Sequence, residues 1–371
     1  MNYRRLLDKL KTRRQRILDG KINCIPLPFP RFRIWWPGIE KKRYTIITAN
    51  QKVGKSKLAD YLYVYAPLFY LLEHPDQLDY EVIYFTLEMG EEEKFNEFLC
   101  HLLFVLDGIR ISPTDLKSTD VLKPVPQEIL DLLETERYIK YIEAYRKMVT
   151  YIGDIKNPTG INKFCRTKAL DPKEGKLIFK KGFIKDEFTG EPIEIDIPDY
   201  YEPVNPEKYR VIIIDNYSNL SNESGLNKMQ TIEKMSKYCI TLRDQLEFTI
   251  VGIQHQAQAQ EGIENFKLNK LKPSPDGLAD CKTTIRDANQ GIGLFSPFKH
   301  GLKDYEGYDI TKFKNYIRFL EVMEDRDNGG AGQMCPLFFD GAVSTFFELP
   351  LPTDKIGIEK VNKYIESLNK N

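Results

Sequence analysis

Short apolar runs alternate with longer amphipathic stretches along most of the 371-residue chain. Six runs have the length and the β-branched or aromatic character of buried strands, and they cover residues 44–48, 82–87, 210–214, 249–253, 291–295 and 317–322. Helical patterns lie between them, at 57–72, 91–106, 126–148 and 226–246. Such alternation is typical of βαβ units, so we predict an α/β fold with a mostly parallel, twisted sheet and helices on both faces.

Two segments depart from this alternation and predict antiparallel strand pairs. Near the C-terminus, two apolar runs flank a Gly-containing turn at 340–342, which predicts a β-hairpin that closes one edge of the sheet. Between residues 171 and 208 the chain becomes charged and alternating, with strand patterns at 176–179 and 193–197. We expect this second segment to be a small β insertion on the surface.

The first 40 residues differ in character from those that follow. Residues 1–20 place arginines and lysines around apolar positions at helical spacing, which predicts a short basic amphipathic helix. Prolines at positions 26, 28, 30 and 37 come next and predict a stiff linker. We therefore divide the chain into an N-terminal helix with its linker (1–40), a central domain (41–350) and a C-terminal helical tail (351–371).

The composition narrows the classes of function. Lys plus Arg number 54 and Asp plus Glu also number 54, so contact with phosphate groups must come from local patches rather than a basic coat. Six cysteines form no Cys-x-x-Cys pair and there are four histidines, which excludes zinc-ligand spacing and a disulfide framework. The N-terminus lacks an apolar signal core, and no apolar stretch is long enough to span a membrane. We expect a soluble intracellular protein.

A strand, a loop and a helix follow one another from residue 44 in the order that a phosphate-binding P-loop requires. The loop consists of Ala49, Asn50, Gln51, Lys52, Val53, Gly54, Lys55 and Ser56. Its backbone N–H groups and the helix N-terminus would hold the phosphates of ATP, with Lys55 reaching the β- and γ-phosphates and Ser56 binding Mg²⁺. A Gly-Lys turn that caps a surface helix is the alternative.

Two acidic residues end predicted strands. Asp215 follows four consecutive apolar residues, which places its carboxylate at the C-terminal edge of a buried strand as the Walker B aspartate that supports Mg²⁺. An N-cap role for Asp215 is the alternative. Glu88 ends the run at 82–87, and a carboxylate there could orient or deprotonate the water that attacks the γ-phosphate.

Several blocks together resemble the RecA-like motor domain of DnaB-type replicative helicases. They are Ala49 at the start of the P-loop, Thr-Leu-Glu-Met at 86–89, the strand and its polar end at 212–217, Ile-Gln-His-Gln at 253–256, the segment 278–289 and the segment 324–329. The resemblance runs from about residue 38 to residue 350, with the blocks in the family's order. It implies a RecA-like P-loop ATPase with a Walker A loop, and a motor without the family's N-terminal domain, as in a phage-type helicase.

The same resemblance implies a reaction, partners and a location. It predicts an ATP-dependent helicase that forms a ring, a hexamer, and moves on single-stranded DNA during replication in a bacterial or phage-infected bacterial cytoplasm. A helicase loader and other replication proteins are candidate partners. The basic helix at 1–20 would dock on the adjacent motor domain, and folding back on its own domain is the alternative.

Three catalytic residues are assigned by the resemblance. Glu88 falls at the family's catalytic glutamate. Gln256 would sense the γ-phosphate, with His255 as the alternative because a shift of one residue along a strand reverses the side chain. Arg326 would reach into the next subunit's site as an arginine finger, while Glu324 stands where the family has a lysine.

Single-stranded DNA would contact the basic, turn-rich stretch between the sensor strand and residue 287. Its cations include the three that we assign to DNA binding, Lys270, Lys272 and Lys282. An ordinary solvated loop is the alternative for each lysine. Two other functions remain open for the whole chain: a RecA-like recombination or regulatory ATPase that binds DNA without unwinding it, and a non-catalytic nucleotide-binding scaffold, which the loss of the expected lysine at position 324 would explain.

Overall fold

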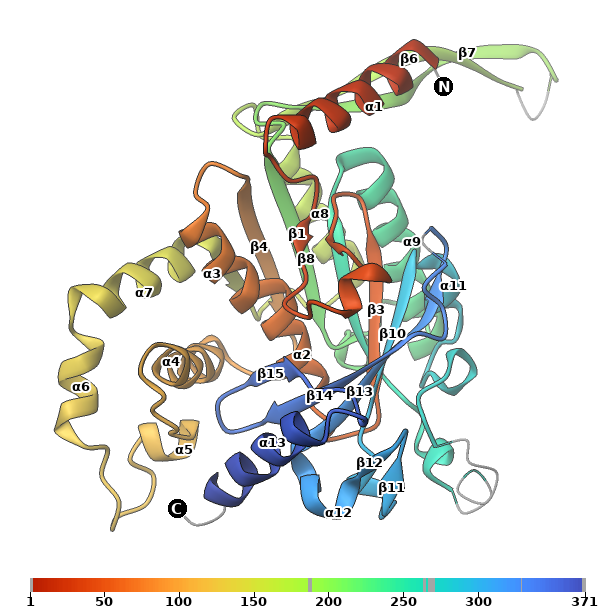
Figure 1. The fold of residues 1–371 in the computed structure, drawn as a ribbon. Coiled ribbons are helices and arrows are strands. Elements are labelled where there is room, and N and C mark those ends of the chain that lie inside the picture. Colours follow the sequence, from red (N-terminus) through yellow and green to blue (C-terminus); the bar gives the residue numbers. More distant parts are fainter. Residues whose placement is uncertain (1–2, 186–188, 263–264, 266–270, 328, 369–371) are drawn as a thin grey trace.

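A computed structural model describes residues 3–185, 189–262, 265, 271–327 and 329–368. Within these residues the main sheet has nine strands in the order β15-β14-β13-β10-β3-β9-β8-β4-β5 (Figure 1). Their bounds are β3 Tyr44–Ala49, β4 Asp79–Thr86, β5 Val149–Ile152, β8 Lys208–Asp215, β9 Thr249–His255, β10 Gln290–Phe295, β13 Ile317–Asp325, β14 Met334–Asp340 and β15 Thr345–Glu348. The strands from β10 to β5 pair in parallel, and β13, β14 and β15 extend the sheet in antiparallel fashion.

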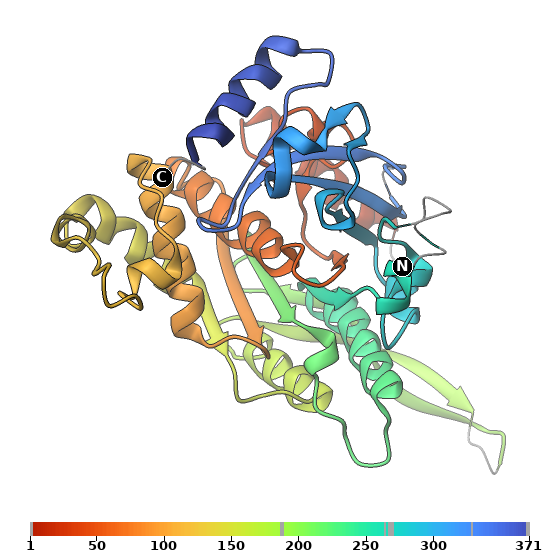
Figure 2. The ribbon, with the colours of Figure 1, turned by 90° about the horizontal axis from the view of Figure 1, so that it is seen from below.

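Helices cover both faces of this sheet (Figures 1 and 2). They are α1 Tyr3–Leu18, α2 Lys55–Asp60, α3 Ala66–Glu73, α4 Glu91–Asp107, α5 Pro113–Leu116, α6 Gln127–Leu133, α7 Glu136–Met148, α8 Pro158–Ala169, α9 Lys228–Leu246, α11 Thr283–Asp287, α12 Ile310–Phe313 and α13 Lys355–Leu368. A π-helical segment, Tyr61–Tyr65, joins α2 to α3. The predicted α/β class and the parallel sheet covered on both faces are confirmed.

Alternating side chains of the parallel strands supply two apolar cores. In β8, Val211 and Ile213 face the core that contains α2, α3, α4 and α7, while Ile212 and Ile214 face the core that contains α8 and α9. A smaller third core lies under α12 and α13, where Ile365 packs near Phe338. Burial on both faces explains why these strands read as continuous apolar runs.

Two elements beside β4 escaped the sequence pattern. The edge strand β5 follows α7 at once, with Val149 capping the helix in an extended conformation, so no turn separates the two. The helix α8 begins at Pro158 after the N-cap Asn157, whose side chain accepts from the backbone N–H of Gly160 at 2.6 Å. The pattern at 126–148 is also two helices, because Thr135 leaves the helical conformation between α6 and α7.

The predicted insertion is a long antiparallel hairpin of β6, Gly175–Lys185, and β7, Pro192–Pro203. It extends beyond the body of the molecule with α1 beside it (Figure 1). The guanidinium of Arg5 in α1 lies 3.5 Å from the ring centre of Tyr200 in β7. We call α1 and this hairpin the N-terminal arm. No residue of α1 is buried.

The proline-rich segment, which we expected to be a stiff linker, packs against the central domain. Its short strands β1, Ile25–Pro26, and β2, Gly38–Ile39, pair with each other. Three side chains between them, Leu27, Phe29 and Trp36, are buried in the core of the α2–α4 face. The prolines fix φ while the residues between them alternate toward the core, so this segment is part of the domain.

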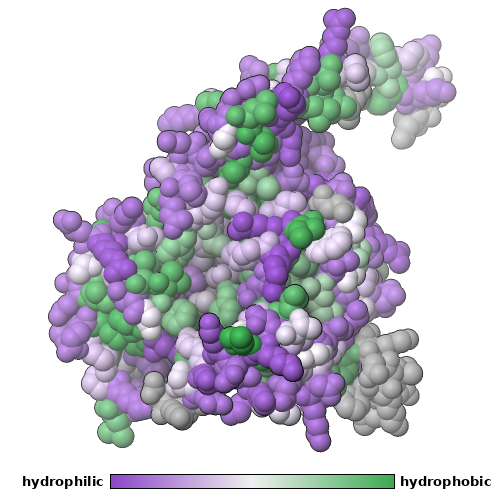
Figure 3. Space-filling model, viewed as in Figure 1, coloured by the Kyte–Doolittle hydropathy of each residue, from purple (hydrophilic) through white to green (hydrophobic). Residues whose placement is uncertain are grey.

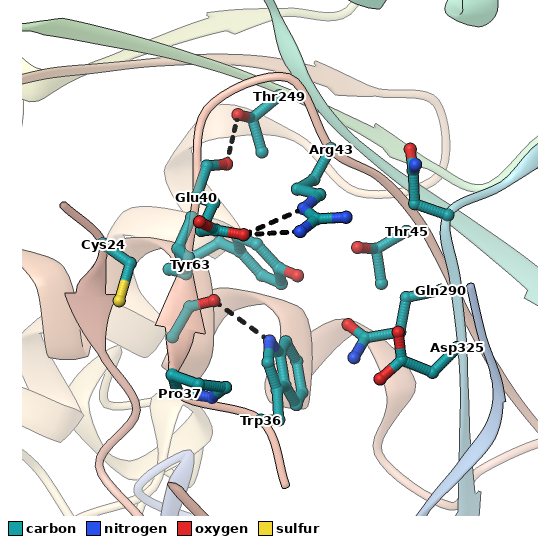
Figure 4. Close-up of a pocket in the computed structure, with 13 residues that line it drawn as sticks. Cys24, Trp36, Pro37, Glu40, Arg43, Thr45, Tyr63, Thr249, Gln290 and Asp325 are labelled. Carbon is teal, nitrogen blue, oxygen red and sulfur yellow. Dashed lines mark hydrogen bonds and ion pairs between the residues drawn. The ribbon is translucent and has the colours of Figure 1, made fainter. Parts of the chain in front are cut away.

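A small cavity of about 100 Å³ remains where this segment meets the sheet (Figure 4). Trp36 donates from Nε1 to the carbonyl of Gly38 at 3.1 Å. On the other side, Arg43 donates to Glu40 at 2.6 and 3.1 Å. The cavity lies at the start of β3, away from the P-loop at its end. No helix among the described residues is long and apolar enough to cross a membrane.

The burial of the proline-rich segment predicts a large effect of truncating one side chain. Phe29→Ala should lower the free energy of unfolding by about 3–5 kcal/mol, because it opens a cavity in the core where Phe29 is 0% exposed. Ile34→Ala, in the same segment but 78% exposed, should change it by less than about 0.5 kcal/mol. Denaturant unfolding measures both, and equal small effects would show that the segment is a loosely attached linker.

Candidate nucleotide site

The P-loop joins the buried end of β3 to α2. Gly54, the N-cap of α2, has φ of 107°, a conformation that side chains other than glycine rarely adopt. A Cβ atom there would also lie 3.0 Å from the ring of Phe339. The loop therefore needs glycine at this position for two independent reasons, its backbone and its packing.

An unpredicted arginine holds the loop from below. Arg318 in β13 donates from Nε to the carbonyl oxygen of Val53 at 2.8 Å, and its guanidinium also donates to the carbonyls of Asn315 and Ile317 at 2.8 Å. Burial lowers the pKa of Arg318 to about 9. A single charged residue inside an apolar strand was the sequence signal that could have drawn attention to it.

Lys55 begins α2 and points along the C-terminal edge of the sheet. Its Nζ lies 2.9 Å from Nδ1 of His255, the last residue of β9. Burial lowers the pKa of Lys55 to about 8, against the carboxylates of Asp215 and Glu88, which raise it. Burial and then the charge of Lys55 lower the pKa of His255 to about 4, so the ring is neutral at pH 7 and can accept from the ammonium. Phosphate oxygens would favour the charged form of Lys55.

The hydroxyl of Ser56 and the carboxylate of Asp215 meet beside this lysine. Ser56 donates from Oγ to Oδ1 of Asp215 at 3.0 Å, and the other carboxylate oxygen accepts from the hydroxyl of Tyr84 at 3.1 Å and lies 3.4 Å from Nζ of Lys94. One hydroxyl and one carboxylate are hard oxygen donors, which suits Mg²⁺ that keeps several waters and binds substrate phosphates. The described residues contain no cluster of three or more His, Cys, Asp or Glu that could hold a metal alone.

Glu88 lies just beyond β4 at the same edge. Its Oε2 accepts from the side-chain amide of Asn216 at 2.7 Å, and the same amide nitrogen is 3.2 Å from Nε2 of His255. The carboxylate is exposed and borders a cavity of about 340 Å³. The structure thus brings Glu88, Asp215 and Lys55 together, as their positions after parallel strands predicted.

Gln256, the residue that we favoured as the γ-phosphate sensor, is bonded elsewhere. Its Nε2 donates to Oγ1 of Thr48 and to the carbonyl of Ser274, both at 3.1 Å. Gln254 is buried and donates to the carbonyls of Ala279 and Cys281 at 2.6 and 2.7 Å. Of these three neighbouring polar residues, His255 is the one whose side chain contacts Lys55, because it ends the strand beside Ala49.

Arg326 lies at the opposite edge of the sheet. It follows β13, and its N–H donates to the carbonyl of Asn289, the residue before β10. The parallel strand β3 separates that edge from Lys55 by roughly 20 Å. The Arg326 side chain is exposed, and it has no ion pair with another described residue; Asp327 pairs with Arg43 instead.

The basic stretch is only partly within the described residues. Lys282 and Arg286 line one cavity of about 370 Å³ together with Arg326 and Glu324. Lys272 is held by Glu321 at 2.9 Å. Lys270, the third assigned DNA contact, lies outside the described residues.

Comparison with known proteins places this geometry in a fold family. No protein-family model matches the sequence, and no curated protein matches it. The chain is similar to a solved helicase ATPase domain, with a TM-score of 0.60, 15% identity, and coverage of 92% of this chain and 98% of that one. The fold is that of a DnaB-like helicase ATPase domain. A solved DnaB-like replicative helicase, described with its interactions with primase, gives a TM-score of 0.63 at 15% identity and coverage of 91% and 67%.

The contact between His255 and Lys55 predicts which polar residue of this strand reads the terminal phosphate. We expect His255→Ala to reduce the preference for a non-hydrolysable ATP analogue over ADP by about 10-fold, the size of one lost hydrogen bond to a charged group. Gln256→Ala, whose amide is bonded to Thr48, should leave that ratio within about 2-fold. Competition binding measures both ratios, and the reverse pattern would return the role to Gln256.

Proposed function

We propose that this protein is an ATP-dependent DNA helicase motor that acts as a ring. The observation that carries the proposal is the meeting of Lys55, Ser56, Asp215 and Glu88 at one sheet edge in the fold of DnaB-like ATPase domains. This combination provides groups for binding phosphates, supporting a metal and activating water.

The residues at this edge take distinct roles. Backbone groups of residues 50–54 and the Lys55 ammonium bind the phosphates of ATP, and Ser56 and Asp215 hold Mg²⁺. Magnesium, when bound, neutralises charge on the β- and γ-phosphates. Glu88 accepts a proton from water as the water oxygen bonds to the γ-phosphorus. The bond from that phosphorus to the bridging oxygen of ADP breaks, so ADP and phosphate leave.

Neighbouring polar groups complete this assignment. The Asn216 amide, which bonds the Glu88 carboxylate, orients it toward the attacking water. His255 senses the terminal phosphate through its position beside Lys55. Single-stranded DNA contacts Lys282 and Lys272, and Lys270 remains part of the proposed DNA contact. A replication role would place the protein in the cytoplasm of a bacterial or phage-infected cell, with a loader or other replication proteins as partners.

Two exposed surfaces of opposite charge support assembly of copies into a ring. The α1 part of the N-terminal arm carries seven Arg and Lys residues and one acid, and it exposes Leu6, Leu10, Ile17 and Leu18. Residues 113–136, which we call the acidic lobe, carry six acids and two lysines and expose Val121 and Leu122. Arm and lobe lie at opposite ends of the molecule (Figures 1 and 3), so they can meet only between copies. A heterologous contact of this kind generates a ring when its rotation closes.

The decisive experiment is steady-state ATP hydrolysis with and without single-stranded DNA. Lys55→Ala and Asp215→Ala should abolish turnover, and Glu88→Gln should bind ATP but hydrolyse it about 100-fold more slowly, because it loses the general base. Hydrolysis together with unwinding of a forked duplex supports the helicase. Hydrolysis without unwinding would indicate a recombination or regulatory ATPase, and wild-type turnover no higher than that of Lys55→Ala would indicate a scaffold.

The distance of Arg326 from its own P-loop predicts action on a neighbour's nucleotide. Arg326→Ala should retain nucleotide binding but lose hydrolysis by about 1,000-fold, the lower end of the range for an arginine finger. Mixing Arg326→Ala with Lys55→Ala subunits should restore part of the activity, at interfaces where an intact Lys55 site faces an intact Arg326.

Arg286→Ala is the matched control for this experiment, because it removes a cation from the same cavity. It should leave hydrolysis without DNA near the wild-type rate. Unchanged hydrolysis by Arg326→Ala alone would refute the finger role, and loss without rescue on mixing would refute action between subunits.

A further inference from the structure

Lys94 is a buried lysine that the phosphate-site assignment does not use. It lies in the first turns of α4 with a side-chain exposure of 1%. Three glutamates precede it at the start of the helix and face solvent, whereas Lys94 turns into the core. A lysine is seldom fully buried unless it is paired, so its contacts define what it does.

Each contact of Lys94 joins a different element. Its Nζ donates to Oδ2 of Asp60 at the end of α2 at 2.8 Å and to the hydroxyl of Tyr84 in β4 at 2.9 Å. It also lies 3.4 Å from Oδ2 of Asp215 at the end of β8. One ammonium group therefore connects the P-loop helix to the strand that carries the metal-supporting carboxylate.

These contacts divide the two oxygens of Asp215. Oδ2 is occupied by Tyr84 and Lys94, which leaves Oδ1 directed at Ser56. Because Lys94 donates to the oxygen of Tyr84, the hydroxyl proton of Tyr84 is available to Asp215. Without Lys94 that proton could turn to Asp60, and the Asp215 carboxylate would lose both restraints on its rotation.

We propose that Lys94 is a positioning residue that fixes the Asp215 carboxylate with one oxygen free for magnesium. This inference rests on the proposed nucleotide site and extends it to a residue that touches neither phosphate nor metal. Groups that hold a metal-supporting residue in this way typically change metal affinity by 10–100-fold when removed.

The same two helices offer a matched control pair. Lys57 of α2 donates to Glu97 of α4 at 2.6 Å, so it also joins α2 to α4 by an ion pair, but neither residue contacts Asp215. Lys94→Met with Asp60→Asn removes one positive and one negative charge near the site. Lys57→Met with Glu97→Gln does the same one turn away. The two double variants thus differ in the contact with Asp215 and not in net charge.

The test measures binding of a fluorescent ADP as a function of Mg²⁺ concentration, in the full chain and without turnover. For Lys94→Met/Asp60→Asn we expect the half-saturating Mg²⁺ concentration to rise by about 10-fold, with binding in the absence of Mg²⁺ within about 2-fold of wild type. The Lys57→Met/Glu97→Gln protein should stay within about 2-fold of wild type under both conditions. Thermal unfolding of both variants separates a shift in metal dependence from a loss of folded protein.

Tyr84→Phe covers the case in which the Lys94 double variant does not fold, because it deletes one hydroxyl and keeps the Lys94–Asp60 pair. It should also raise the half-saturating Mg²⁺ concentration, since one of the two restraints on Oδ2 is lost. Equal Mg²⁺ dependence in wild type, Tyr84→Phe and any folded Lys94 variant would overturn the positioning role. A wild-type protein whose ADP binding ignores Mg²⁺ would instead overturn the proposed nucleotide site, and this inference with it.

Discussion

Parallel pairing of four adjacent strands, β3, β9, β8 and β4, holds the candidate phosphate site together. Ala49 is level with His255 and Thr86 is level with Asp215, so the loops that follow all begin at one edge. Side chains of these strands alternate between two apolar cores. A slip of one residue would exchange the cores and turn His255 away from Lys55, so apolar burial on both faces fixes the chemistry at the edge.

Polar groups beneath that edge act on geometry more than on stability. A buried ion pair gains little over apolar packing, because removing two charges from water offsets their attraction. Lys94 with Asp60, and Arg318 with the Val53 carbonyl, are buried in positions where an apolar residue would pack equally well. Their hydrogen bonds are directional, and each is aimed at an element that binds phosphate or metal. These residues define where the loop and the carboxylate stand.

Much of this fold could be predicted from the sequence, because six of the parallel or central strands are continuous apolar runs and the P-loop follows one of them directly. The rest depends on features that a pattern does not carry. The strand β5 has no turn before it, and the apolar residues between the prolines of 25–39 alternate over too short a distance to indicate a core. Lys94 reads as one more charge at a charged helix start. The choice between His255 and Gln256 needed the strand's last paired residue, which the sequence leaves open by one position.

The strand β13 extends from the P-loop to the far edge of the sheet. Arg318, near its start, holds the Val53 carbonyl, and Arg326 directly follows its end, so eight residues of extended chain, about 26 Å, separate them. Hydrogen bonds to β10 and β14 on either side make this segment stiff. If Arg326 reaches the nucleotide of an adjacent subunit, β13 is a rigid rod between two successive sites, and a displacement of one phosphate loop is carried to the next subunit without a flexible joint between them.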